Sequence, residues 1–377
     1  MIYLDNAATA PMDPRVIEAM ARAMRDLTGN PSSLHGPGAR ARAAINEARA
    51  ILAGLVGCAP AELVFTSGGT EADALAIRGG AEAARGRHVV LSAIEHAAVL
   101  ANREWLERRG FEVTLVPPDS SGLIHPDAVH AALRPDTALV AVMHANNELG
   151  TIQPVAAIGA RIERECPRAL YLIDAVQSFL KEPLALDEAR ADLVALSAHK
   201  IHGPKGVGAL YVRRGRRVLP QLAGGAQEAG LRAGTENVGG VIGFAVAAGL
   251  ARPREEVPRM TALRDRLIAG ALQACSDAHV NGDGAPRLCS HASLRFPGAR
   301  SQTLLHLLES EGVVASAGSA CHASARAPSH VLVAIGLSGD QGTVRFTLSR
   351  DTTEPDIDHT IEALRRVVPR ARELNQR

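Results

Sequence analysis

Between about residues 59 and 212, short β-type runs alternate with helical stretches, and this alternation restricts the fold more than any other feature of the 377-residue chain. Such alternation is typical of a largely parallel sheet with helices on its faces. The expected strands are 62–66, 88–92, 112–116, 138–143, 170–174, 192–197 and 207–212. Expected helices lie between them, for example at 71–85, 99–109, 127–133 and 155–165. We therefore predict an α/β fold with a mainly parallel, seven-stranded sheet.

The pattern of expected elements changes near residue 251, where the regular alternation of strands and helices stops. A helix at 258–274, a strand near 292–296, a helix at 301–311, a strand near 343–349 and a helix at 354–374 follow. This pattern predicts a smaller α+β domain. We expect a large domain at 13–250 and a small domain formed by 1–12 and 251–377, which carries a loop at about 315–329.

Composition excludes several classes of protein. Hydrophobic residues make up 46% of the chain and charged residues 21%, as in an ordinary soluble globular protein. A net charge of +1, without a Lys/Arg block, argues against direct binding of nucleic acid or a membrane surface. The start lacks the features of a secretory signal, and no apolar run is long enough to span a bilayer. The five cysteines (58, 166, 275, 289 and 321) show neither a disulfide framework nor metal-site spacing. We expect a cytoplasmic enzyme without a metal.

Unusual polar residues follow the expected strands of the large domain. The clusters are 66–71, 92–96, 144–148, 174–178 and 197–200. In open α/β sheets, ligands bind outside the carboxyl ends of the strands. No single cluster is diagnostic, but together they predict one pocket at that edge of the sheet.

Lysine is scarce in this chain and is concentrated in one place. Lys and Arg total 41, yet only Lys181, Lys200 and Lys205 are lysines, and two of them lie in the segment 197–208. Arginine matches lysine as a charge, but only lysine offers a primary amine that can lose its proton and attack a carbonyl. A lysine in this segment is therefore expected to take part in chemistry.

Two further clusters indicate which cofactor such a lysine serves. The turn Ser67-Gly68-Gly69-Thr70 enters a helix and could bind a phosphate, although, taken alone, it is more readily explained as an ordinary turn with a Thr cap. It is not a Walker loop. Asp174 ends an apolar strand, where a carboxylate needs a partner. Pyridoxal phosphate carries a phosphate and a protonated ring nitrogen, and it requires a lysine such as Lys200.

On these residues, the chain closely resembles the cysteine desulfurases, which are pyridoxal-phosphate enzymes of fold type I in the class V aminotransferase superfamily. The resemblance runs from residue 3 to residue 354. Its strongest segments are 29–33, 65–71, 95–96, 146–150, 174–177, 197–206, 224–228 and 232–237. The resemblance implies a fold-type-I transferase and a homodimer.

The resemblance also implies a role for each residue of the predicted pocket. Lys200 would hold the cofactor covalently and later move the α-proton of the substrate, whereas Lys205 would be a surface cation. Asp174 would pair with the ring nitrogen. The other implied contacts are Gly69, Thr70, Ser197 and His199 with the phosphate, Thr235 with the phosphate from a second subunit, Gln177 with the ring hydroxyl, His96 with the ring face, and Asn147 and Arg345 with the substrate carboxylate. From pattern alone, His96 could be structural and Arg345 could form a surface ion pair.

Cys321 decides the reaction that this resemblance implies. It lies in the loop at 315–329, among small residues without periodicity, where a thiol is accessible. The loop is similar to the longer catalytic loop of the housekeeping and nitrogenase-linked desulfurases. Cys321 would then attack the sulfur of L-cysteine, leave L-alanine and pass its persulfide sulfur to an acceptor protein. Iron–sulfur scaffolds, tRNA-thiolating enzymes and DNA-phosphorothioation proteins are the acceptors that such an enzyme could serve.

The sequence departs from the family pattern at three positions: Ala10, Ala74 and His322. A Cys-His pair at 321–322 is also similar to the selenocysteine lyases, so the preference between cysteine and selenocysteine stays open. The pattern is also compatible with a plain aminotransferase, in which Cys321 would be incidental, and with a non-catalytic sulfur carrier.

Overall fold

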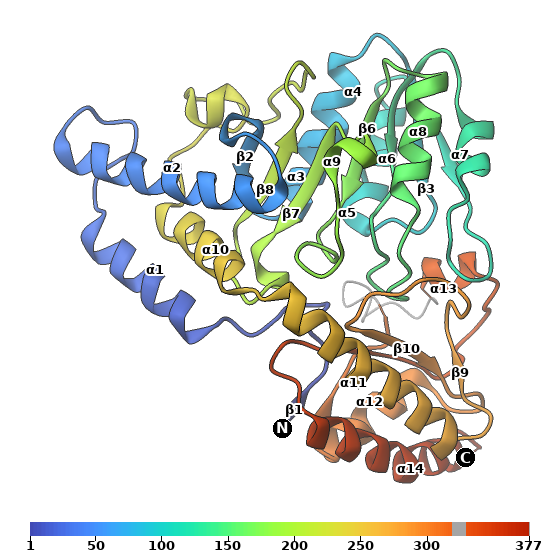
Figure 1. The fold of residues 1–377 in the computed structure, drawn as a ribbon. Helices are drawn as coiled ribbons and strands as arrows, with labels where there is room; N and C mark the ends of the chain where they lie inside the picture. The colour runs from blue at the N-terminus through green and yellow to red at the C-terminus, as the bar shows by residue number, and fades with distance from the viewer. Residues whose placement is uncertain (319–328, 377) are drawn as a thin grey trace.

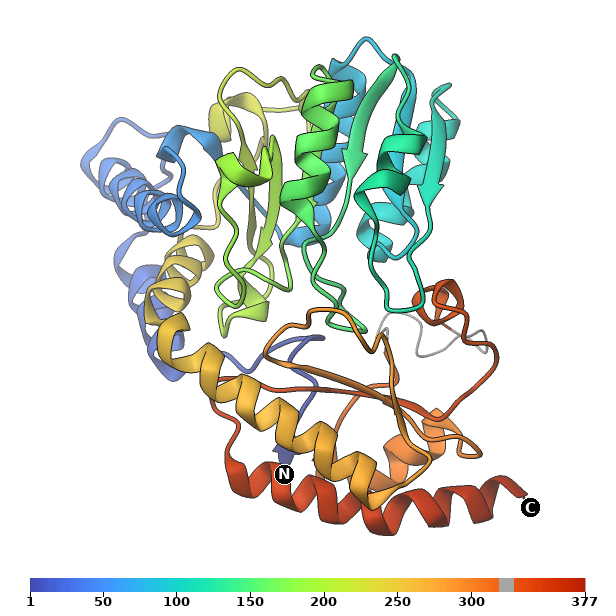
Figure 2. The same ribbon diagram turned by 45° about the vertical axis from the view of Figure 1, so that its right-hand side comes forward.

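The computed structural model describes residues 1–318 and 329–376. Figures 1 and 2 show a large sheet with helices on both faces, and below it a smaller α+β part that holds both termini. No helix among the described residues is both long enough and apolar enough to cross a membrane.

The large sheet has seven strands in the order β2-β8-β7-β6-β5-β3-β4. The strands are β2 (Leu63–Thr66), β3 (His88–Ser92), β4 (Glu112–Val116), β5 (Thr137–Ala141), β6 (Leu170–Asp174), β7 (Leu193–Ser197) and β8 (Gly208–Val212). Strands β3 to β7 pair in parallel, and β8 runs antiparallel between β2 and β7. The predicted mainly parallel, seven-stranded sheet is confirmed, and six of its strands end at one edge.

Alternate residues of each central strand enter two separate apolar cores, one on each face of the sheet. In β6, Tyr171 and Ile173 belong to one core, while Leu170 and Leu172 belong to the other. Because both faces are buried, the strands read as nearly continuous apolar runs. This is why their positions could be predicted from the sequence.

Helices cover both faces of the sheet. One face packs against α1 (Pro14–Asp26), α2 (Gly36–Val56), α7 (Pro126–Ala132), α8 (Val155–Glu165), α9 (Leu186–Ala189) and α10 (Val238–Leu250). The other face packs against α3 (Gly69–Ala74), the π-helical η2 (Leu75–Gly79), α4 (Gly80–Ala83), α5 (Ala97–Leu100) and α6 (Asn102–Glu107). Short 3₁₀ turns are η1 (Pro60–Glu62), η3 (Ala198–Lys200) and η4 (Gln227–Gly230).

The smaller part is assembled from both ends of the chain. Its strands are β1 (Ile2–Tyr3), β9 (His279–Val280), β10 (His291–Arg295), β11 (Val313–Val314) and β12 (Thr343–Thr347), and its helices are α11 (Pro253–Ala274), α12 (Ser301–Ser310) and α14 (Glu354–Gln376). The short α13 (His330–Ala334) packs instead against the core of the large sheet. β1 pairs with β11, and Leu4 is buried in the same core as Phe296 and Phe346. The boundaries that we expect for the two domains remain a prediction.

Several expected elements differ from the structure in their bounds, and two of them do so for identifiable local reasons. The strand expected at 138–143 ends at Ala141. Beyond it, the Met143 amide donates to the Glu95 side chain, although the amides of Val142 and His144 still donate to carbonyl groups of β6. The helix expected at 71–85 contains the π-helical turn η2. It ends in Gly79, where a Cβ would lie 2.2 Å from the carbonyl oxygen of Leu219.

Candidate active site

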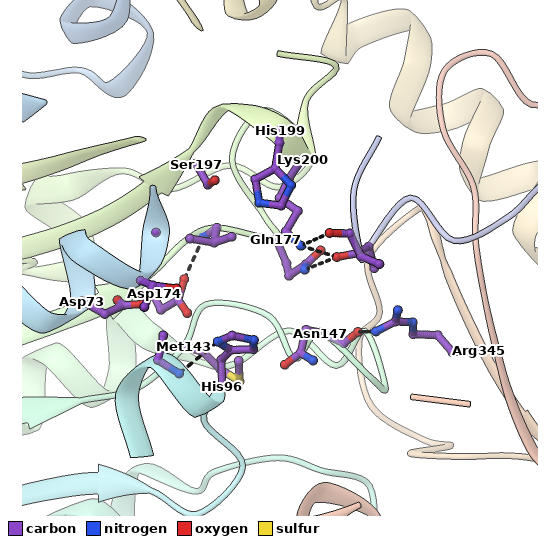
Figure 3. Close-up of a pocket in the computed structure, with 16 residues that line it drawn as sticks. Asp73, His96, Met143, Asn147, Asp174, Gln177, Ser197, His199, Lys200 and Arg345 are labelled. Carbon is purple, nitrogen blue, oxygen red and sulfur yellow. Dashed lines mark hydrogen bonds between the residues drawn. The ribbon is translucent and has the colours of Figure 1, made fainter. Parts of the chain in front are cut away.

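The polar residues at the strand ends gather around one cavity of about 240 Å³, as the sequence predicted. A molecule of liquid water occupies about 30 Å³, so the cavity has room for a small organic ligand. Figure 3 shows the cavity with its lining residues, of which ten are labelled. The lining comprises Ala7, Ala8, Gly69, Thr70, Asp73, His96, Ala98, Met143, Asn147, Asp174, Val176, Gln177, Ser197, His199, Lys200 and Arg345.

Lys200 ends η3, directly after β7, and its amine points across the cavity (Figure 3). The Nζ atom donates to the carbonyl oxygens of Ala7 at 2.5 Å and Ala8 at 2.7 Å. Burial, reinforced by the charges of Arg345 and Lys181, lowers the pKa of Lys200 to about 8. The neutral, nucleophilic amine is therefore far more accessible near neutral pH than in an exposed lysine. Lys205 is exposed, as expected for a surface cation.

Asp174 ends β6 and is 6% exposed. One carboxylate oxygen accepts the main-chain N–H of Val176 at 2.8 Å. Burial raises the pKa of Asp174 to about 6, although the Val176 N–H and the charge of Lys200 oppose this rise. A cationic ligand atom beside this carboxylate would supply the charge partner that its buried position lacks.

A group of hydrogen-bond donors lines the cavity, and Figure 3 shows one of them, Ser197, across the cavity from Arg345. The main chain at Gly69 and Thr70 begins α3, where amides have no partner inside the helix. The Ser197 hydroxyl is buried and has no hydrogen-bond partner in the described part of the chain. The His199 ring contacts the Thr9 hydroxyl at 3.2 Å, and burial lowers its pKa to about 4. This arrangement suits an anionic oxygen group.

Gln177 and His96 flank the middle of the cavity. The Gln177 amide donates to the Ala7 carbonyl oxygen at 3.0 Å, and its Oε1 has no partner within the described residues. His96 caps α5, where its Nδ1 accepts the main-chain N–H of Ala98 at 3.1 Å. That bond requires an unprotonated Nδ1, which leaves Nε2 as the atom that can carry a proton.

Arg345 lies in β12 and reaches the cavity from the smaller part of the molecule. It is 2% exposed, and one Nη atom donates to the Asn147 carbonyl oxygen at 2.7 Å (Figure 3). The other Nη atom donates to the Asp5 carboxylate at 2.8 Å. From the sequence alone, Arg345 could have formed an ion pair on the surface. Its burial excludes this possibility.

Two of the predicted site residues are not among those that line the cavity. Thr235 is exposed on the segment that follows η4. Cys321 lies outside the described residues. The segment that follows its loop is anchored by a buried glutamate, since the Ser329 hydroxyl donates to Glu148 at 2.6 Å.

Sequence reasoning missed six of the lining residues, namely Ala7, Ala8, Asp73, Ala98, Met143 and Val176. The carbonyl groups of Ala7 and Ala8 and the carboxyl group of Asp73 all line the cavity. Main-chain groups carry no residue signature, so no pattern could have revealed the first two. Asp73 lies in the first turn of an expected helix, where a polar residue usually faces solvent, yet it is 1% exposed.

The carboxyl groups of Asp73, Asp174 and Glu95 form a buried acidic cluster. Burial and the charge of Asp174 hold the pKa of Asp73 well above its usual range. Burial raises the pKa of Glu95 to about 8, against the hydrogen bonds from Ser92 at 2.5 Å and the Met143 N–H at 2.6 Å. Near neutral pH Glu95 therefore keeps its proton, and Asp174 ionises more readily than Glu95.

Substitution of Glu95 by Gln tests this cluster through stability. The folded chain keeps the Glu95 proton up to about pH 8, whereas the unfolded chain loses it near pH 4.5. The free energy of unfolding therefore falls as pH rises through this window. We expect E95Q to gain about 2 kcal/mol relative to wild type between about pH 5.5 and about pH 7.5, measured by denaturant unfolding of the cofactor-free protein. E104Q, on the exposed face of α6, should show the same pH dependence of the free energy of unfolding as wild type. The same pH dependence in E95Q as in wild type would contradict the prediction.

Within the described residues, no group of three or more His, Cys, Asp and Glu side chains is placed to hold a metal ion. The cavity instead combines a nucleophilic amine, a buried carboxylate, anion-binding donors and a buried arginine. Fold and site together thus define an α/β protein with a partly buried lysine in a ligand-sized cavity.

Comparison with known families shows to which family this protein belongs. The profile of the family described as aminotransferase class-V matches residues 2–360. The chain therefore belongs to the class-V aminotransferases.

Individual relatives specify the branch of that family. The chain is 43% identical to "Cysteine desulfurase IscS" of Dictyoglomus turgidum, covering 99% of this chain and 96% of the relative. It is also 43% identical to "Cysteine desulfurase IscS" of Methanosarcina thermophila, covering 99% and 93%. Among solved structures, a "NIFS-LIKE PROTEIN" superposes with a TM-score of 0.90 at 36% identity, covering 98% of this chain and 99% of that one. The resemblance to the cysteine desulfurases that the motifs indicated is confirmed.

Proposed function

We propose that this enzyme is a pyridoxal-phosphate-dependent cysteine desulfurase, which converts L-cysteine to L-alanine and keeps the sulfur as a persulfide on Cys321. The observation that carries the proposal is that one cavity brings together Lys200, Asp174, the hydrogen-bond donors at Gly69, Thr70, Ser197 and His199, and Arg345. Full-length similarity to proteins named cysteine desulfurase supports it.

The residues of the cavity fit pyridoxal phosphate. Ser197 has a buried hydroxyl and Gln177 a buried amide oxygen, each without a partner among the described residues, and the cofactor offers a phosphate and a ring hydroxyl. Asp174 would pair with the ring nitrogen, and Gly69, Thr70 and His199 would join Ser197 at the phosphate. When bound, the cofactor supplies an electron sink for the electron pair released at the substrate α-carbon.

The chain's own residues would then handle the substrate and its protons. Arg345 and Asn147 would hold the α-carboxylate, since a planar guanidinium matches a carboxylate. The Lys200 amine would take the proton from the α-carbon, and His96 would hold or return a proton through Nε2. The Cys321 thiolate would attack the substrate sulfur. The bond between that sulfur and the β-carbon breaks, the sulfur remains on Cys321, and the three-carbon skeleton takes up a proton and leaves as L-alanine.

We further propose a homodimer in the cytoplasm. The exposed position of Thr235 suits a contact with the phosphate site of a second copy, since this residue does not reach the cavity of its own chain. The persulfide sulfur would pass to an acceptor protein, for iron–sulfur cluster assembly, tRNA thiolation or DNA phosphorothioation. A neighbour titled "Crystal structure of DndA from streptomyces lividans" superposes with a TM-score of 0.77 at 38% identity, covering 92% of this chain and 99% of that one.

Turnover of L-cysteine by the purified holoenzyme tests the proposal. With a thiol reductant to release the persulfide, we expect equal amounts of alanine and sulfide. L-Selenocysteine, supplied separately, distinguishes a desulfurase from a selenocysteine lyase. Selenide release with negligible use of cysteine would make the enzyme a selenocysteine lyase. Absence of alanine from both substrates, in protein that shows the cofactor's visible band, would favour an aminotransferase.

A further inference from the structure

Arg345 is already paired with an acidic residue of its own chain. One Nη atom donates to the Asp5 carboxylate at 2.8 Å, and the other donates to the Asn147 carbonyl oxygen at 2.7 Å. The Nε atom is buried and has no hydrogen-bond partner in the described part of the chain. The Arg345 guanidinium thus already binds the carboxylate of Asp5, and it still has N–H groups that could donate to a second carboxylate.

Asp5 is held in this position by its main chain. Its carbonyl oxygen accepts the N–H groups of Ala8 at 3.1 Å and Thr9 at 3.4 Å, and its backbone bridges to Thr347 in β12. The Asp5 side chain is 18% exposed and the Arg345 side chain 2%. Because these contacts fix the backbone of Asp5, its carboxylate can leave Arg345 only by rotation of the side chain.

We propose that Asp5 sets the affinity of this site for carboxylates by remaining on Arg345 and opposing an incoming carboxylate. The inference rests on the proposed function, in which Arg345 takes the α-carboxylate of the substrate. Two carboxylates on one guanidinium repel each other strongly when they are shielded from water. The site therefore binds monocarboxylates weakly, which favours release of the product L-alanine.

Substitution of Asp5 by Asn separates charge from shape. The Asn side chain keeps the oxygen that accepts from Arg345 but loses the negative charge. We expect propionate, a carboxylate without amine or thiol, to bind D5N about tenfold more tightly than wild type. Competition against L-cysteine measures this affinity, and so does the rise in the holoenzyme Tm with propionate concentration. The neutral propionamide should bind D5N and wild type equally.

Asp13 provides a matched control for the loss of a buried ion pair. Its carboxylate also pairs with an arginine of the smaller part of the molecule, Arg350, at 2.5 Å. The two side chains are 8% and 11% exposed, and neither lines the cavity. We expect D13N to lose stability but to bind propionate as wild type does.

Further variants keep the proposal falsifiable. Asp5→Glu retains the charge and should not tighten propionate binding, whereas Asp5→Ser removes it and should tighten binding as D5N does. Equal or weaker binding of propionate by D5N and D5S would overturn the proposal. So would a gain that persists when Arg345→Gln is combined with D5N. Because the Tm measurement requires no turnover, failure of the wild type to use L-cysteine would defeat the proposed function alone.

Discussion

Replacement of Lys200 by Arg is expected to lower alanine formation from L-cysteine by roughly three orders of magnitude or more. Arginine preserves the positive charge that acts on Asp174 but offers no amine that can lose its proton near neutral pH. Burial lowers the pKa of Lys200 to about 8, so the native side chain has this ability. Turnover is measured by alanine release. Mass spectrometry after borohydride reduction should find the cofactor on the peptide that contains residue 200 in wild type, and on no peptide in K200R.

The two other lysines are controls for this result. Lys205 lies five residues further along the same segment and is exposed, so K205R should behave as wild type. Lys181 is a stricter comparison, because burial lowers its pKa as well. It does not line the main cavity. Full activity in K200R, or labelling of the peptide around residue 181 in wild type, would show that the lysine has been assigned wrongly.

The large sheet could be predicted because each of its strands is recognisable from residues that are close together in the sequence. The strands β3, β4 and β6 have the bounds that the sequence indicated, since each is a short β-type segment closed by polar or turn-forming neighbours. The polar residues at the strand ends had to meet, because parallel strands end at one edge. Thus Asp174, Ser197 and Lys200 could be assigned to one pocket from the sequence alone.

The parts that could not be predicted depend on contacts between distant residues. Asp5 and Arg345 are 340 residues apart, and nothing near either residue indicates that they pair. The same holds for the carbonyl groups of Ala7 and Ala8, which meet Lys200 only because β1 joins the C-terminal part of the chain. The helices α1, α2 and α10 have no counterpart among the expected elements. α10 is apolar on all sides, so it lacks the periodicity that reveals a surface helix.

The four described cysteines are poor candidates for the nucleophile. Burial raises the pKa of Cys58 to about 11 and also raises those of Cys166, Cys275 and Cys289. Only the thiolate attacks sulfur efficiently, and each of these groups is a thiol near neutral pH. If a thiol of this chain takes the substrate sulfur, Cys321 is therefore the expected nucleophile.

Replacement of Cys321 by Ala is therefore expected to reduce alanine and sulfide formation from L-cysteine by at least about a hundredfold, while the cofactor's visible band remains. In the proposed site the band would depend on Lys200 and its surroundings, whereas removal of the substrate sulfur would need the thiolate. Cys58→Ala, the change at the partly exposed cysteine, is the matched control and should keep wild-type activity. Persulfide trapped by alkylation after a single turnover should map to residue 321 in wild type. Undiminished sulfide release by C321A would exclude a persulfide on this residue, and selenide release that survives the substitution would show that selenocysteine is processed without it.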